Sequence, residues 1–141
     1  QFLRIELPSG RALHYQHPKM EVRKIKYETD EGQIEYFEKE CFTFMGNLDQ
    51  HWFRISAHAG GILENIAQAI ARDVLQVGLR RAHQAGLDIR IHVHDEIATL
   101  ANSGDSESEL KLLIDCMTNP IPWAGGLLLA ADGYTSTRYK K

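Results

Sequence analysis

Two imidazoles and two carboxylates fall within five residues near the middle of the chain, at His92, His94, Asp95 and Glu96. Side chains alternate along a strand, so adjacent acids face one site only where the backbone bends. Carboxylates gathered at such a bend suit Mg²⁺, which takes one or two of them from a protein. Paired ions of this kind stabilise the attacking and leaving oxygens of a phosphoryl displacement. The pattern therefore indicates metal-dependent phosphoryl transfer at Asp95 and Glu96.

Other interpretations of these residues stay open. Asp95 and Glu96 could be turn residues with a structural role alone, because Asp is favoured in turns. His92 and His94 could chelate zinc, although zinc sites need three or four ligands and no other histidine completes a motif. A small metal-dependent phosphoesterase or nuclease could use all four residues. No GxSxG elbow and no phosphate-cradling glycine loop is present.

A β-hairpin is expected to carry these residues. Residues 87–94 alternate between apolar and polar types, which is typical of a half-buried strand. Residues 97–101 form the predicted return strand, so His94-Asp95-Glu96 lies at or near the hairpin tip. The predicted apolar face consists of Leu87, Ile89, Ile91 and Val93, and the polar face of Asp88, Arg90, His92 and His94.

A long amphipathic helix is predicted before this hairpin, over residues 60–85, with Gly86 as its C-cap. The expected apolar face consists of Leu63, Ile66, Ala67, Ile70, Val74 and Val77. The opposite stripe carries Asn65, Arg72 and Gln76, with Gln68 flanking it. Such a stripe is by default a solvated face. Amide and guanidinium groups also hydrogen-bond sugars and base edges, so a stripe that faces nucleic acid is the second interpretation.

The remaining segments complete an α+β prediction. Two hairpins, separated at His17-Pro18, are expected over residues 2–15 and 22–37, with Ile25 and Tyr27 sharing a face with Ile34 and Tyr36. The other predicted segments are a connector over residues 41–56, a loop over 102–108, a helix over 109–118, a strand over 126–131 and a polar tail over 134–141. The long helix is expected to pack its Leu63, Ile70 and Val74 face on an antiparallel sheet.

Composition sets limits on the class of protein. The chain has 141 residues, 43% of them hydrophobic, and a net charge of −3, which suits one ordinary globular core and does not indicate a broad basic surface. No apolar run approaches the roughly 18 residues of a membrane span. Cys41 and Cys116 form no motif, so we expect two reduced thiols in a cytoplasmic protein.

The segments around the acids resemble a known family. ENIAQAIARDVL (residues 64–75), followed by HVHDE (residues 92–96), resembles family A DNA polymerases of the bacteriophage type, which are related to bacterial DNA polymerase I. LPSGRALHY (residues 7–15) is similar to the β segment after the fingers helix of that family. PWAGGLLLAADGYTSTRYKK is similar to its phage-type C-terminus. The resemblance is strong over residues 59–96, weaker at both ends, and poor over residues 20–47.

The resemblance implies roles for individual residues. HDE corresponds to motif C of the palm, where Asp95 matches the metal-binding aspartate and Glu96 its acidic neighbour. His94 matches the histidine against the primer terminus, and Gln68 the glutamine that contacts the minor groove. Asp73 matches a structural aspartate on the same helix. For Asn65 and Arg72, which belong to the phage-type motif, DNA contact is a weaker implication.

Two parts that the family needs are absent from the sequence: the motif A aspartate and the fingers helix. The chain also begins at Gln1-Phe2 without an initiator Met, so we expect a fragment. Residues 1–57 would be a hairpin extension after the fingers, and residues 58–141 the C-terminal part of the palm. The implied partners are primer-template DNA, deoxynucleoside triphosphates, two Mg²⁺ ions and the missing N-terminal part, in a bacterial or phage-infected cell. We expect this chain alone to be inactive, and a non-catalytic DNA-binding module remains an alternative.

Overall fold

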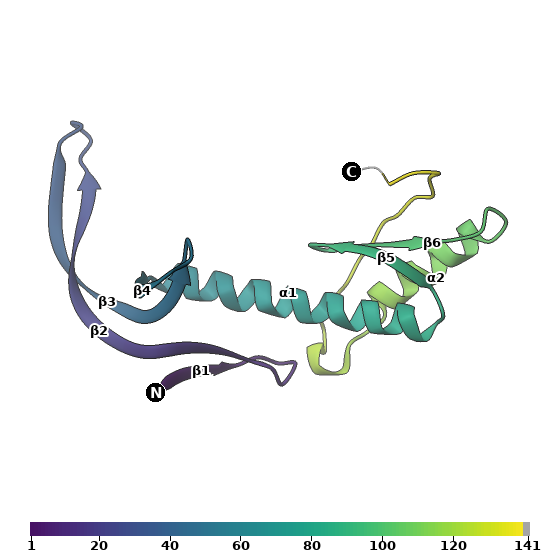
Figure 1. Cartoon of the computed structure of the whole chain (residues 1–141), viewed down its shortest axis with the longest axis horizontal. Coiled ribbons are helices and arrows are strands. Elements are labelled where there is room, and N and C mark those ends of the chain that lie inside the picture. The colour runs from purple at the N-terminus through teal and green to yellow at the C-terminus, as the bar shows by residue number, and fades with distance from the viewer. Residues whose placement is uncertain (140–141) are drawn as a thin grey trace. The chain divides into compact units, whose positions relative to one another are not determined.

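The computed structural model describes residues 1–139, apart from the side chain of Leu48. Lys140 and Lys141, which end the predicted tail, lie outside the described residues. Within the described part, the chain forms a four-stranded and a two-stranded antiparallel sheet, two α-helices and a short 3₁₀ helix (Figure 1). The α+β prediction is therefore confirmed.

The chain divides into two compact units, residues 1–66 and residues 67 onward, which we call unit 1 and unit 2. The division lies inside the long helix α1 (Ala59–Gln84). The predicted division between residues 57 and 58 falls where β4 ends, and as a statement about domains it stays a prediction. The helix itself is confirmed to within one residue at each end.

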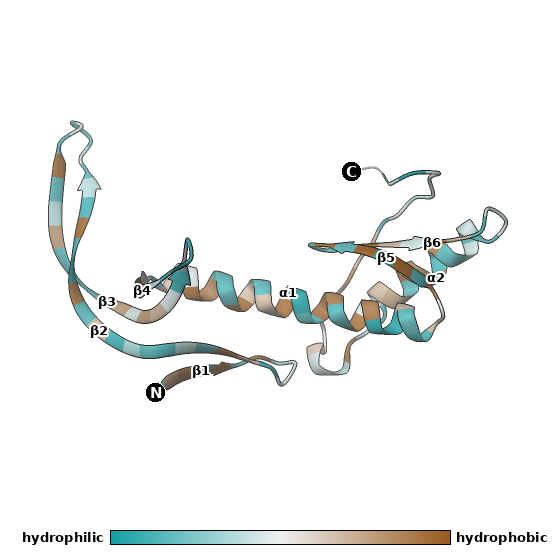
Figure 2. Ribbon diagram, viewed as in Figure 1, coloured by the Kyte–Doolittle hydropathy of each residue, from teal (hydrophilic) through white to brown (hydrophobic). Residues whose placement is uncertain are grey.

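Unit 1 contains the four-stranded sheet, in the order β1-β2-β3-β4. The strands are β1 (Phe2–Glu6), β2 (Ala12–Glu28), β3 (Ile34–Leu48) and β4 (His51–Ala57). The predicted first hairpin is confirmed, and its turn contains Gly10 with a φ of 84° that favours glycine. Beyond β1 and β4, strands β2 and β3 continue as a two-stranded ribbon, residues 19–41, which we call the arm (Figure 2).

The predicted break at His17-Pro18 is wrong, because β2 runs through it with a bulge between Gln16 and Lys19. His17 has a positive φ of 47° at this point. The hydroxyl of Thr43, which is fully buried, donates to the Lys19 carbonyl at 2.9 Å. Arg54 donates to the His17 carbonyl at 3.0 Å and to the Thr43 hydroxyl at 3.2 Å. These polar contacts satisfy groups that the bulge removes from the ladder.

The predicted pairing in the arm is wrong by one residue. Ile25 pairs with Phe37, and Tyr27 pairs with Glu35, to which its hydroxyl donates a hydrogen bond. The rings of Tyr27 and Phe37 meet edge to face with centroids 5.6 Å apart. A shift of one residue exchanges the two faces of a strand, so Ile34 and Tyr36 lie on the other face of the ribbon.

The predicted connector over residues 41–56 is also wrong, since this segment forms the β3–β4 hairpin. Its two-residue turn consists of Asp49 and Gln50, both with positive φ, of 52° and 65°. Two positive φ angles are the mark of the type I′ turn, whose usual sequences are Asn-Gly and Asp-Gly. The Asp49-Gln50 pair lacks that glycine, so the turn gave no clear signal in the sequence.

In unit 2, α1 ends in a Schellman motif, where Gly86 has a φ of 83°. The Gly86 amide donates to the His83 carbonyl at 3.0 Å, and the Leu87 amide to the Ala82 carbonyl at 3.1 Å. Ala82 and Leu87 then join one buried cluster with Leu113 and Cys116. The predicted C-cap is confirmed, and it leads the chain from the helix into the core.

The second helix, α2 (Ser106–Thr118), begins three residues before its predicted start. Arg81 of α1 binds the end of this helix, because it donates to the Cys116 carbonyl in its last turn at 3.4 Å and to the Asn119 and Pro120 carbonyls just after it at 2.7 Å each. A 3₁₀ helix, η1 (Pro122–Ala124), follows. The predicted strand over residues 126–131 is wrong, because none of the described strands pairs with it. A strand forms when its backbone N–H and C=O groups pair with those of a neighbouring strand, and this segment has no such neighbour.

The predicted apolar face of α1 is partly wrong. Leu63 is 67% exposed, although it was expected to pack on the sheet. The buried residues of α1 are Ala69, Asp73, Leu75, Gly78 and Ala82. Small residues on this helix allow a close approach to α2: a Cβ atom at position 78 would lie 3.4 Å from the Cα of Met117. The helix therefore packs through Gly78 and Ala82 as well as through its large side chains.

Candidate functional site

The candidate acids lie at the turn of the hairpin formed by β5 (Asp88–Val93) and β6 (Glu96–Leu100). Val93 pairs with Glu96, so His94 and Asp95 are the two residues of the turn. His94 has a φ of 52°, which is uncommon for a residue other than glycine and is often associated with functional sites. The expected position of the trio at the hairpin tip is confirmed.

A bulge at Arg90 changes which side chains share a face. Before it, Ile89 pairs with Thr99, whereas beyond it Ile91 pairs with Ala98 and His92 with Ile97. Opposite residues of an antiparallel pair lie on one face, so His92 joins the face of Ile89 and Ile97 that packs on the core cluster. The predicted face of His92 is therefore wrong, and Ile91 is moved to the opposite face.

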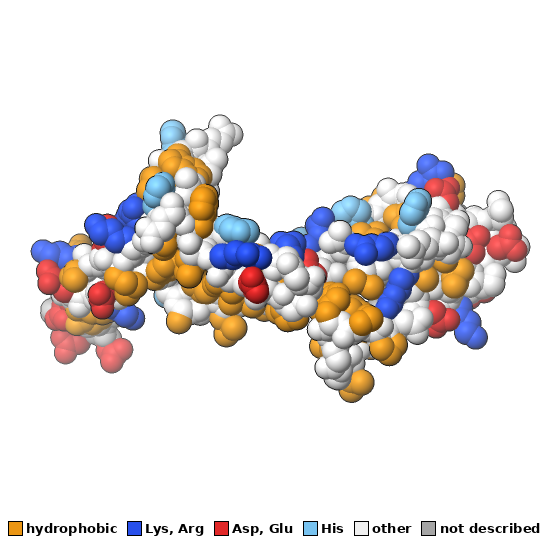
Figure 3. Space-filling model, turned by 90° about the horizontal axis from the view of Figure 1, so that it is seen from below, with side chains coloured by type: hydrophobic (Ala, Val, Ile, Leu, Met, Phe, Trp, Pro, Cys, Tyr) orange, Lys and Arg blue, Asp and Glu red, His pale blue; other side chains and the backbone are white. Residues whose placement is uncertain are grey.

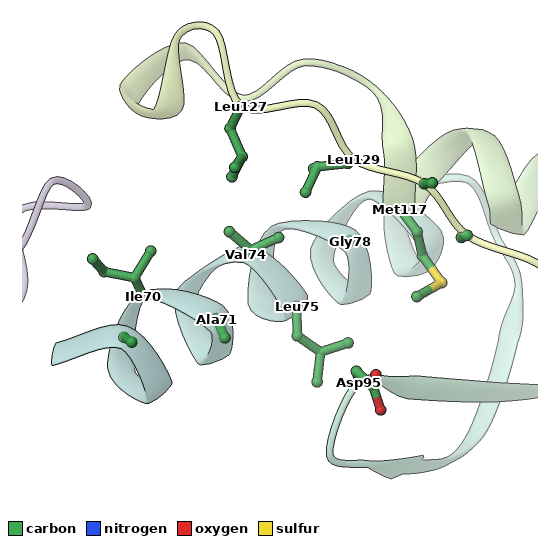
Figure 4. A pocket seen from close by; sticks show the side chains of 12 residues that line it. Ile70, Ala71, Val74, Leu75, Gly78, Asp95, Met117, Leu127 and Leu129 are labelled. Atoms are coloured by element: carbon green, nitrogen blue, oxygen red, sulfur yellow. The ribbon is translucent and has the colours of Figure 1, made fainter. Parts of the chain in front are cut away.

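Asp95 borders an apolar cavity of about 510 Å³ (Figure 4). The cavity lies between α1, the hairpin turn and the segment that follows η1, and Asp95 is the one carboxylate in its lining. Its other lining residues are Ala67, Ile70, Ala71, Val74, Leu75, Gly78, Met117, Leu127, Leu129, Ala130 and Ala131. Asp95 itself is exposed, so the apolar lining borders its carboxylate on one side and leaves it open to solvent.

Glu96 has different surroundings. It accepts a hydrogen bond from the hydroxyl of Tyr139 at 3.0 Å. This bond raises the pKa of the Tyr139 phenol above its usual value, and partial burial adds to the shift. The two adjacent acids are therefore distinct: Asp95 faces an apolar cavity, whereas Glu96 is engaged by a phenol.

Helical spacing relates the predicted stripe to the hairpin. Leu75 lies beside Asp95 in the cavity lining. Gln68 is seven residues before Leu75 on α1, so the two residues are about 20° apart around the helix axis. Gln68 and Arg72 are both exposed. By helical spacing, Gln68 therefore lies on nearly the same side of α1 as Leu75, and Arg72 about 60° away from it.

The other predicted helix residues have structural surroundings. In unit 1, the Asn65 amide donates to the hydroxyl of Tyr15 at 3.2 Å. In unit 2, Asp73 is buried, with 5% of its surface exposed, which agrees with the structural role expected for it. A contact of Asn65 with DNA would compete with the bond to Tyr15.

The donor set at the turn fits Mg²⁺. Asp95 and Glu96 offer carboxylate oxygens, and Mg²⁺ keeps several water ligands when it binds one or two carboxylates. Among residues 1–139, no group of three His, Cys, Asp or Glu side chains is arranged to hold a metal ion. The hairpin thus has two adjacent carboxylates and, within the described residues, no complete metal-binding group.

Sequence reasoning missed Tyr139, which lies 43 residues after Glu96 in the chain. It also missed the anchoring of the α2 C-terminus by Arg81. No short-range pattern could have revealed either contact, because each joins elements that meet only in the folded unit.

The chain is 40% identical over 138 residues to a protein of Bacillus phage SP02 described as a DNA polymerase. The match covers 97% of this chain and 19% of that polymerase, so the chain spans about a fifth of its relative. No family model and no solved structure matches the chain. Among the described residues, no helix is both long enough and apolar enough to cross a membrane. The chain is similar to part of a phage DNA polymerase.

Proposed function

We propose that this chain is the C-terminal part of the palm of a family A, template-directed DNA polymerase. The observation that carries the proposal is the 40% identity with a phage DNA polymerase over nearly the whole chain. The turn at His94-Asp95 supports it, because this turn presents a carboxylate beside a helix that bears exposed amide and guanidinium groups. The parent protein would add deoxynucleotides to the 3′ end of a primer.

In the proposed reaction, the primer 3′-oxygen attacks the α-phosphorus of the incoming nucleotide, and the bond to the pyrophosphate leaving group breaks. Asp95 and Glu96 would hold Mg²⁺, which supplies charge stabilisation at the attacking and leaving oxygens. A second aspartate and the nucleotide-binding helix would come from the N-terminal part of the polymerase. The isolated chain is accordingly expected to be inactive.

The helix and the turn would position the primer terminus. His94 would lie against the terminal nucleotide, while Gln68 and Arg72 would face the minor groove. For Asn65, DNA contact stays the weaker prediction, because its amide donates to the Tyr15 hydroxyl. Hydrogen-bond readout in that groove is degenerate, which suits an enzyme that must accept every base pair. The net charge of −3 indicates that duplex affinity would come mainly from the rest of the polymerase.

Primer extension by the complete polymerase tests the proposal. Asp95→Ala should abolish extension and leave primer-template binding intact, because the carboxylate acts on the metal and not on the duplex. Asp115→Ala is the matched control, since Asp115 is an exposed aspartate on α2. Extension by the Asp95→Ala enzyme at the rate of the control would rule out the assignment.

A further inference from the structure

The segment after η1 contacts the helices of unit 2 at several points, although most of its residues are exposed and it forms no helix or strand. Leu127, Leu129 and Ala131 line the cavity that Asp95 borders (Figure 4). Gly133 lies so close to α2 that a Cβ atom there would stand 2.7 Å from Leu110 Cδ1. The Thr135 hydroxyl donates to Glu107 of α2 at 3.1 Å. The segment is therefore docked on the helices before it reaches the hairpin.

Beyond this docked stretch, the segment returns to the acids. The Tyr139 hydroxyl donates to Oε2 of Glu96 at 3.0 Å. Glu96 is the first residue of β6, so the ladder pair with Val93 fixes its backbone and leaves its carboxylate to turn about its side-chain bonds. A hydrogen bond from a phenol to a carboxylate selects one of these orientations.

We infer that Tyr139 is a positioning residue for the hairpin acids: it holds the Glu96 carboxylate in one orientation, so that Asp95 and Glu96 have separate tasks. Asp95, which borders the cavity, is left to bind the metal directly. Glu96 supports it from a position set by Tyr139. This inference rests on the proposed polymerase function, and it gives the C-terminal segment a role in the site beyond packing.

The test uses Tyr139→Phe in the complete polymerase. This change removes one oxygen atom and keeps the ring. We expect the Mg²⁺ concentration for half-maximal single-turnover extension to rise about threefold to tenfold, the range of one partly exposed hydrogen bond. The dissociation constant for primer-template should not change. Tyr36→Phe is the matched control, because Tyr36 is an exposed tyrosine on the arm, 64% exposed against 51% for Tyr139.

A double-mutant cycle with Glu96→Gln separates positioning from a structural effect. If Tyr139 acts through Glu96, adding Tyr139→Phe to the Glu96→Gln enzyme changes nothing further. Binding of Mn²⁺ to the enzyme with a dideoxy-terminated primer, followed by electron paramagnetic resonance, gives a readout without turnover. In the Tyr139→Phe enzyme, the dissociation constant for Mn²⁺ should rise by the same factor as the Mg²⁺ concentration for half-maximal extension.

Additive effects of the two changes, or wild-type Mg²⁺ and Mn²⁺ responses in Tyr139→Phe, would overturn this inference. If Asp95→Ala is inactive in the same experiment, the proposed function stands while the role of Tyr139 fails. If Asp95→Ala extends primers normally, the proposed function itself fails.

Discussion

The arm and the β5–β6 hairpin are both antiparallel two-stranded ribbons, but they are supported differently. The arm, residues 19–41, is a long ribbon whose apolar side chains lie exposed among acidic and basic ones (Figure 3). The β5–β6 hairpin is short, and its Ile89 and Ile97 pack on a buried cluster of α1 and α2 residues. One hairpin depends on its ladder and cross-strand pairs, whereas the other depends on a core.

This difference bears on the position of the proposed metal-binding carboxylate, Asp95. A site must hold its side chains to within a fraction of an ångström, and side chains on packed elements meet that demand better than side chains on free ones. The β5–β6 turn is backed by two helices, whereas an isolated two-stranded ribbon is marginally stable in water. Four acids lie close together in sequence at the tip of the arm, Glu28, Asp30, Glu31 and Glu35, and their charge would repel the phosphates of DNA there.

The largest expected difference is between the effects of Leu113→Ala and Val22→Ala on the free energy of unfolding. Leu113 is 6% exposed in the core of unit 2, so its truncation should cost about 2–5 kcal/mol. Val22 is 67% exposed on the arm, and its truncation should change the free energy of unfolding by less than about 0.5 kcal/mol. Equal costs would contradict the distinction between the two hairpins.

Each unit has its own fluorescent reporter for this measurement, since Trp52 lies in unit 1 and Trp123 in unit 2. Urea unfolding of a Trp52→Phe background reports unit 2, and a Trp123→Phe background reports unit 1. The Leu113→Ala effect should appear in the Trp123 signal.

The contact between α1 and α2 should tolerate one methyl group and no more. Gly78→Leu should cost about 1–3 kcal/mol, because the Cα of Met117 lies 3.4 Å from the position of the new Cβ. Gly78→Ala is the control: that separation is an ordinary contact, and alanine raises helix propensity by about 1 kcal/mol. A Gly78→Leu protein that unfolds at the same urea concentration as Gly78→Ala would show that the helices are not in close contact.

The base of the arm should depend on polar contacts. Thr43→Val keeps the shape but leaves the Lys19 carbonyl and the Arg54 guanidinium without the hydroxyl, at a cost of about 1–3 kcal/mol. The Trp52 signal measures this loss. Ser56→Ala is the control, because Ser56 pairs with Thr43 in the ladder but is exposed. Similar losses in both variants would argue against a special role for the buried hydroxyl.

The smallest expected effect is a pH dependence at Glu21. The hydrogen bond from Lys19, with further contributions from Arg23 and Arg54, holds the pKa of Glu21 below its usual value of 4.5. Since the folded pKa is lowered, these contacts stabilise the protein above the usual carboxyl pKa and are lost as the pH falls through the folded value. Glu21→Gln should thus lower the melting temperature slightly at pH 7 and not at pH 2. A difference that persists at pH 2 would assign the effect to packing.

Elements with strong local periodicity could be predicted from the sequence. The long helix, its glycine cap and the hairpin tip at His94-Asp95-Glu96 all follow from patterns within a few residues. The predictions of which side chains share a strand face were less accurate, because one additional residue in a strand exchanges its two faces. The bulge at Arg90 and the pairing of Ile25 with Phe37 illustrate this, since register depends on turns and partners that periodicity does not report.

Elements that depend on distant partners could not be predicted. The sequence of residues 126–131 suggests a strand, yet this segment has no ladder in the described structure and lines a cavity through Leu127 and Leu129. The bond from Tyr139 to Glu96 spans 43 residues. The position of the acids at the hairpin turn could thus be predicted from the sequence, whereas the surroundings that distinguish Asp95 from Glu96 could not.

We propose that the hairpin turn carries a metal-binding carboxylate of a polymerase. Single-turnover primer extension by the complete polymerase with Asp95→Asn tests it most directly, because the change removes the charge and keeps the shape. We predict a rate at least about 10²-fold to 10³-fold below wild type, with primer-template affinity unchanged. A rate within about threefold of wild type would contradict the account.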